Sequence, residues 1–222
     1  MAFHHSPQLV TENLVMLLDA ANTKSYPGSG ALITDLSGQG LNVTLSNSPT
    51  FDTANLGGLI YDGVNQFGST NDVAYARFWH DQAWSVSFVV KLVSWVNTWP
   101  GIFKKGNSGA SQPGVLLFYG SAGRLTWKHY NTSTSWDSLT LGVPAHITIT
   151  FGAGTTGKLY VNGDYKTALP ILQGTETSSP IRFGQGDVYG NVEHYHWAKY
   201  SKELTASEVL QNYNALKGRF SL

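Results

Sequence analysis

Apolar and polar residues alternate with a period of two through most of the chain. From Trp84 to Leu92 every second residue is apolar, and Ile147, Ile149 and Phe151 repeat the pattern. This period places alternate side chains on opposite faces of a β-strand, so both segments are expected to be strands with one buried face. Shorter segments of similar character are also expected to be strands: 14–19, 58–62, 102–105, 115–119, 124–131, 158–162, 164–168, 181–184 and 192–200.

Turn-forming sequences separate these segments. The clearest is Asn162-Gly163, because both residues tolerate the positive φ of a two-residue hairpin turn. About a dozen short strands at this spacing predict an all-β jelly-roll sandwich. No repeat or linker interrupts the pattern, so we expect one domain over residues 13–222, preceded by an N-terminal arm over residues 1–12.

One helix is expected, over residues 205–217. Thr205 and Glu208 have the spacing of a capping box, and Leu204 and Val209 that of a hydrophobic staple. Gly218 is placed to end the helix at the C′ position. The expected apolar stripe consists of Val209, Leu210, Tyr213 and Leu216.

The composition of the chain excludes several classes of function. The 222 residues carry 14 basic and 14 acidic side chains, and the charged fraction of 13% is about half the usual share. A neutral chain lacks the basic patch typical of nucleic-acid binding. The absence of cysteine excludes disulfides, a thiolate nucleophile and Cys-ligated metal. The start of the chain has no secretory-signal pattern, and the apolar run 14–18 is far short of the ~20 residues of a membrane span.

Five segments together resemble a known family. They are LVMLLDAAN at 14–22 with KSYPGSG at 24–30, DLSGQG at 35–40, YDGVN at 61–65, LYVNG at 159–163, and the ending from 203 to 220. In this order they resemble the laminin-G-like, concanavalin A-like lectin/glucanase jelly rolls, in the form found in structural proteins of tailed phages, cyanobacterial phages especially. The resemblance implies two facing antiparallel sheets. The sequence departs from the family pattern at Gln66, where an acidic residue is common, and at His194, Trp197 and Lys199.

The leading functional expectation is a non-enzymatic virion module on the outside of a phage particle, as a head-decoration or tail-associated protein. Its partners would be other virion proteins and host surface glycans, with homo-oligomer formation open, and it would be made in the host cytoplasm without a signal peptide. The alternatives are a free-standing carbohydrate-binding lectin and a glycan-degrading enzyme. Against the enzyme, none of the five Glu residues has Asp or Glu two positions later, as the paired carboxylates of the hydrolase relatives do.

Sugar binding is assigned to aromatic residues. Trp127 and His129 share a face of one expected strand, and Trp136 lies in the polar loop expected after it. Trp95 and Trp99 flank Asn97 in another loop. Aromatic rings stack on the apolar faces of saccharides, but the same rings are favoured in sandwich cores and protein interfaces, so these alternatives stay open.

Metal binding is the weaker expectation. His194 and His196 are two positions apart on one strand and would point to the same face, and Glu193 nearby, or His129 and His146 from other strands, could complete a site. The favoured interpretation is that both histidines are polar residues on a solvated sheet face. No cofactor is expected, although calcium stays open because four aspartates stand beside loop-forming residues; Asp35 and Asp62 are equally explained as Asx turns. These aspartates are Asp19, Asp35, Asp62 and Asp187.

Overall fold

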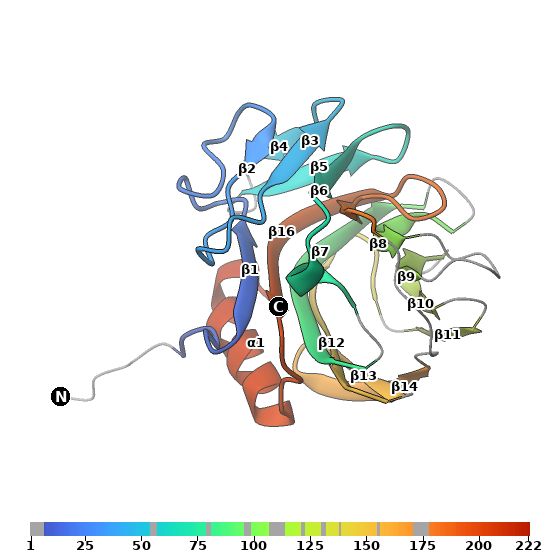
Figure 1. Ribbon diagram of the computed structural model, residues 1–222. Helices are drawn as coiled ribbons and strands as arrows, with labels where there is room; N and C mark the ends of the chain where they lie inside the picture. Colours follow the sequence, from blue (N-terminus) through green and yellow to red (C-terminus); the bar gives the residue numbers. More distant parts are fainter. Residues whose placement is uncertain are drawn as a thin grey trace.

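Two eight-stranded sheets face each other in the computed structural model, which describes residues 7–53, 57–78, 81–95, 99–106, 114–120, 123–129, 132–137, 139–154, 156–170 and 178–222 (Figure 1). All strand pairs are antiparallel. The first sheet, sheet A, runs in the order β14 (Asp164–Pro170), β13 (Thr156–Val161), β12 (Pro144–Gly152), β7 (Ala83–Ser94), β16 (Asn191–Tyr200), β5 (Gly58–Asp62) and β4 (Thr50–Asp52), and β1 (Leu14–Asp19) also pairs with β16.

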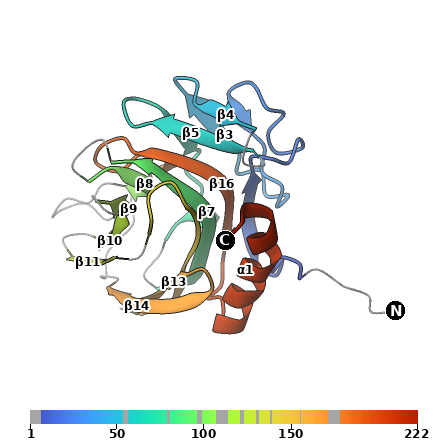
Figure 2. The ribbon, with the colours of Figure 1, turned by 180° about the vertical axis from the view of Figure 1, so that it is seen from behind.

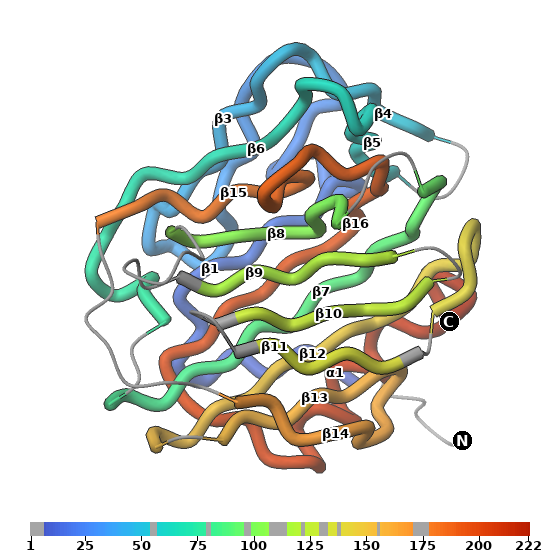
Figure 3. Tube along the Cα trace, turned by 90° about the vertical axis from the view of Figure 1, so that its right-hand side faces the viewer, coloured from blue at the N-terminus to red at the C-terminus, as the bar shows by residue number. Residues whose placement is uncertain are grey.

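The second sheet, sheet B, lies in front of sheet A in Figure 3. Its order is β11 (Thr132–Asp137), β10 (Arg124–His129), β9 (Gly114–Tyr119), β8 (Gly101–Gly106), β15 (Ile181–Phe183), β6 (Phe67–Thr70), β3 (Val43–Ser46) and β2 (Leu32–Ile33). A short 3-10 helix covers Ala74–Ala76. The two sheets, with one α-helix among the described residues, confirm the predicted jelly-roll sandwich.

Aromatic rings fill the space between the sheets. Phe88 of β7 and Trp197 of β16 stack with ring centroids 4.7 Å apart, and Phe103 and Phe183 of sheet B meet Trp197 edge-on at 5.0 and 4.7 Å. The alternation predicted from Trp84 to Leu92 is present, since all five of its apolar members are buried in this core. Trp197 is therefore a core residue that joins both sheets.

The helix α1 (Ala206–Phe220) packs on the outer face of sheet A, as the view from behind shows (Figure 2). The capping box of Thr205 and Glu208 is confirmed, with both reciprocal hydrogen bonds formed. The expected end at Gly218 is wrong. The helix continues to Phe220, whose ring packs against Tyr195 with centroids 5.3 Å apart, and it ends at Ser221 in the left-handed conformation.

The apolar stripe of α1 also differs from the prediction. Leu210 is 47% exposed, and the position facing the sheet is taken by Asn212, which is fully buried. Its side-chain oxygen accepts a hydrogen bond from the backbone of Val10 (2.9 Å), and its amide donates to the Tyr200 hydroxyl (3.1 Å). Asn212 therefore fastens the N-terminal segment and sheet A to the helix.

Two further expectations change. Residues 132–137, expected as a polar loop, form the edge strand β11 in register with β10. Residues 7–12 of the expected arm are docked on the domain, since Gln211 donates to the carbonyl of Gln8 and Lys202 pairs with Glu12; residues 1–6 lie outside the described residues. No helix among the described residues is long and apolar enough to cross a membrane.

Candidate functional site

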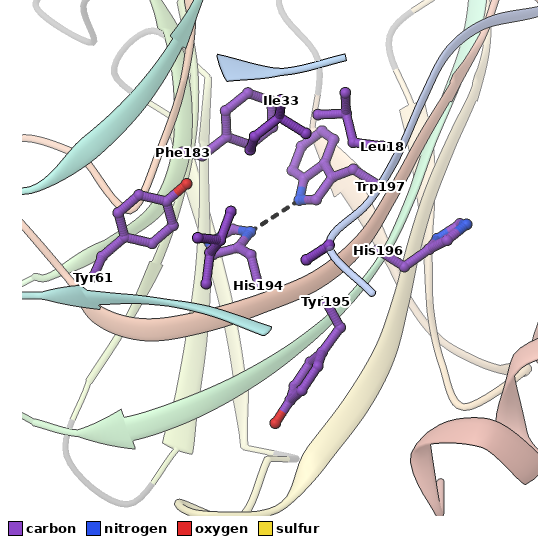
Figure 4. Close-up of a pocket in the computed structure, with 10 residues that line it drawn as sticks. Leu18, Ile33, Tyr61, Phe183, His194, Tyr195, His196 and Trp197 are labelled. Carbon is purple, nitrogen blue, oxygen red and sulfur yellow. Dashed lines mark hydrogen bonds between the residues drawn. The ribbon is translucent and has the colours of Figure 1, made fainter. Parts of the chain in front are cut away.

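The two histidines of β16 point to opposite faces of sheet A. A β-bulge between His194 and His196 breaks the alternation, so the expectation of a shared face is wrong. His194 turns into the sandwich, where the indole N–H of Trp197 donates to its Nδ1 (3.1 Å), and His196 points away from both toward α1 (Figure 4). A two-residue spacing therefore does not bring these imidazoles together.

Both histidines are buried. Their exposed fractions are 6% and 2%, so the interpretation as residues on a solvated face is also wrong. Burial lowers the pKa of His194 to about 3 and that of His196 to about 4, where the Asp19 carboxylate partly opposes it. The cavity beside them holds about 20 Å³, room for a water molecule but not for a sugar. Within the described part of the chain no group of three His, Asp or Glu side chains is placed to hold a metal.

The loop aspartates are held by backbone donors. Asp35 accepts from the amides of Leu17, Ser37 and Leu41 at 2.8 to 3.0 Å. The Oδ1 atom of Asp62 accepts hydrogen bonds from the backbone amides of Val64, Asn65 and Gln66, which confirms the Asx-turn interpretation. Gln66 completes this turn, because its Oε1 accepts from the Asp62 amide and its amide reaches the Ser48 carbonyl.

Each glutamate that the structure describes has a lysine partner. Glu193 is fully buried and pairs with Lys91, and Glu203 pairs with Lys158 at 2.8 Å. Glu12 and Glu208 share Lys202 at 2.6 and 2.7 Å; Glu176 lies outside the described residues. These carboxylates serve as ion-pair partners within the fold.

The residues predicted to contact sugar lie in different environments. Trp127 has no exposed surface, and its indole N–H donates to the Pro170 carbonyl (3.1 Å), so the ring is part of the core. Its assignment to sugar stacking is corrected by this burial. Trp136 is partly buried against the same core. The side chain of His129 lies outside the described residues.

Trp95 and Trp99 remain available to a ligand. They stand on the connection that takes the chain from β7 to β8, and 49% and 50% of their surfaces are exposed. Trp99 lies edge-on to Phe118, with ring centroids 6.3 Å apart. Val143, 50% exposed, belongs to a turn bound to the end of β7. We call these three exposed residues, Trp95 after β7, Trp99 before β8 and Val143 before β12, the tryptophan end.

Two backbone segments cross in close contact next to Trp99. The start of β8 meets the loop after β15, where the Gly101 amide donates to the Val188 carbonyl (3.2 Å). A Cβ at Gly101 would collide with the backbone of Gly186, and one at Gly190 would collide with Gly101. Trp99 itself has a φ of +61°, a conformation that costs a non-glycine residue about 1–2 kcal/mol. Strain of this kind persists where the surroundings hold it, often at ligand sites.

Solved structures confirm the architecture. The binding domain of Paraclostridial Mosquitocidal Protein 1 superposes with a TM-score of 0.73 at 20% identity, over 92% of this chain and 52% of that one. Trypanosoma rangeli sialidase gives 0.71 at 15% identity, over 95% and 34%. The binding domain of Botulinum Neurotoxin DC, solved with SialylT, gives 0.70 at 16% identity, over 93% and 52%. The chain thus spans about half or less of these proteins, and the likeness is one of fold.

The sequence itself matches a family model over residues 62–209, which is about two thirds of the chain. No curated protein is similar enough in sequence to match it. The matched segment runs from the last residue of β5 into α1 and includes the tryptophan end. On this match and the lectin-like sandwich, the chain belongs to the concanavalin A-like lectin/glucanases superfamily.

Proposed function

We propose that this domain is a non-enzymatic module that binds glycans at the tryptophan end. The observation that carries the proposal is the pair of half-exposed indoles, Trp95 and Trp99, on one connection anchored by the glycine crossing. Lectin-like relatives of this fold, including a toxin binding domain solved with SialylT, support it by analogy.

The exposed rings offer a modest binding energy. Half of an indole surface of about 250 Å², at about 25 cal/mol per Å², gives roughly 3 kcal/mol for each ring before the cost of association. Two rings together therefore suit a weak site, with a dissociation constant in the millimolar to micromolar range. Such a site gains useful strength when several copies act together.

Titration of the full chain with a panel of saccharides tests the proposal. Trp99→Ala and Trp95→Ala should each weaken binding about tenfold or more, while Tyr165→Ala, which removes an aromatic side chain 55% exposed on β14, should leave it unchanged. Binding that survives the double Trp95→Ala/Trp99→Ala variant would refute the assignment of the site.

We also propose that the module is carried on the exterior of a tailed-phage particle, attached to other virion proteins. The support is the sequence resemblance of the five segments between residues 14 and 220 to phage structural proteins. Mass spectrometry of purified particles tests this placement: the protein should be present at a stoichiometric level, and its absence from particles would leave the free-standing lectin as the better reading of the same glycan site.

A further inference from the structure

Three cations stand in one row across the outer face of sheet B. The strand registers place Arg182 of β15 opposite Lys104 of β8, Lys104 opposite Leu116 of β9, and Leu116 opposite Lys128 of β10. Figure 3 shows these strands side by side in that order. With strands about 4.8 Å apart, the backbone positions of the first and last cation are about 14 Å apart.

The row faces outward because its chain neighbours face inward. Phe183, Phe103, Leu117 and Trp127 adjoin the four row positions, and all four belong to the core between the sheets. Leu116 is nevertheless fully buried, with a lysine on each side whose alkyl stem suits covering it. Lys104 and Lys128 therefore stand on either side of an apolar residue.

Like charges lie next to one another in this row. Arg182 and Lys104 are like charges directly opposite one another, an arrangement that destabilises a sheet. Partial burial and Arg182 both lower the pKa of Lys104, against the pull of Asp187. In the part of the chain that the structure describes, no carboxylate forms an ion pair with any of the three cations of the row. An anion bound here would relieve this repulsion.

The Arg182 guanidinium is already oriented. It lies over the Phe67 ring at 5.2 Å and donates one hydrogen bond to the side-chain oxygen of Gln185 (2.9 Å). A guanidinium has five N–H donors in a planar fork, so donors remain for a ligand carboxylate. Holding the fork in advance lowers the entropy lost on binding.

The row is also close to the tryptophan end. Leu116 and Phe118 are two residues apart on the same face of β9, about 7 Å along the strand, and Trp99 packs against Phe118. We propose that the glycan bound by this domain is acidic, with its carboxylate or sulfate group on Arg182 and Lys104 and its sugar ring toward Trp99. This inference rests on the proposed glycan-binding function and names its ligand class.

Calorimetric titration of the full chain at low salt tests the inference. The probes are polygalacturonate and alginate for carboxylates, chondroitin sulfate for sulfate, dextran for a neutral glycan, and a single-stranded DNA oligonucleotide. We expect an acidic glycan to bind at least tenfold more tightly than dextran, and Lys104→Gln and Arg182→Gln each to weaken it about tenfold. Arg182→Lys keeps the charge but not the fork, and should fall between.

The control is Lys24→Gln, which removes an exposed lysine from the loop after β1 and should change nothing. Equal binding of acidic and neutral glycans, lost in Trp99→Ala but not in Lys104→Gln, would overturn the acidic ligand and leave the proposed function standing. No binding of any glycan would overturn both. DNA bound as tightly as alginate, with Lys24→Gln as harmful as Lys104→Gln, would overturn a specific site in favour of general attraction to polyanions.

Discussion

Three buried histidines should make this domain unstable in mild acid. Burial lowers the pKa of His146 and His194 to about 3 and that of His196 to about 4, whereas an unfolded histidine titrates near 6.5. Between these values the unfolded chain binds protons that the folded chain does not. The free energy of unfolding therefore falls as the pH falls below 6.5.

The expected loss follows from the same linkage. From pH 7.0 to 5.5 each histidine that stays neutral in the fold removes roughly 1.2 kcal/mol, so the three together remove about 4 kcal/mol. The carboxylates with lowered pKa, those of Asp19, Asp62, Asp72 and Glu208, act in the same direction. Their contribution is lost only as the pH falls below about 4, so this pH window isolates the histidines.

Urea unfolding followed by tryptophan fluorescence at pH 7.0 and 5.5 measures the effect. His196→Leu is the informative variant, because neither nitrogen of His196 has a hydrogen-bond partner among the described residues, and its removal should reduce the pH dependence by about a third. An unfolding free energy that agrees within 1 kcal/mol at the two pH values would refute the reasoning. A His196→Leu variant with the full pH dependence would refute the part assigned to that residue.

Three substitutions test other parts of the structure. Gly101→Ala should destabilise the domain by about 1–3 kcal/mol in urea unfolding, because its Cβ meets the Gly186 backbone, whereas Gly120→Ala makes only ordinary contacts at 3.8 Å and should be tolerated. Thr205→Ala removes the helix cap and should cost about 1 kcal/mol, seen as a melting temperature lower by about 2–4 °C, with Thr205→Ser close to wild type. Trp127→Phe should lower stability by about 2 kcal/mol and leave glycan affinity unchanged; a stable variant with lost affinity would contradict its place in the core.

Local patterns predicted much of the fold because their causes are local. The Asn162-Gly163 turn has the positive φ values, 52° and 84°, that its residue types favour, and the capping box forms within four residues. The end of α1 shows where this reasoning stops. Gly218 is a good local stop signal, but burial of Phe220 against Tyr195 extends the helix beyond it.

The site depended on contacts that no local pattern contains. The alternation from His194 to Trp197 is typical of a regular strand, and only the pairing with β7 introduces the bulge that separates His194 from His196. Gly101 and Gly186 meet across 85 positions of sequence, so their need to be glycine had no signal nearby. The sequence offered Trp127 and Trp99 alike as sugar-stacking residues, and only burial in the fold distinguishes them.

Net charge is a sum over the whole chain, whereas binding depends on where charges stand. The 14 basic and 14 acidic residues cancel, and many of the acids are used beside a cation within the fold, as Glu203 is with Lys158. The outer face of sheet A is covered by α1 and residues 7–12, so Ser87 and His146 are buried there and hydrogen-bond to each other at 2.7 Å. The outer face of sheet B keeps three cations in a row between β15 and β10. A neutral chain thus presents a locally basic surface, because many of its acidic residues pair with cations elsewhere in the fold and its helix covers sheet A and not sheet B.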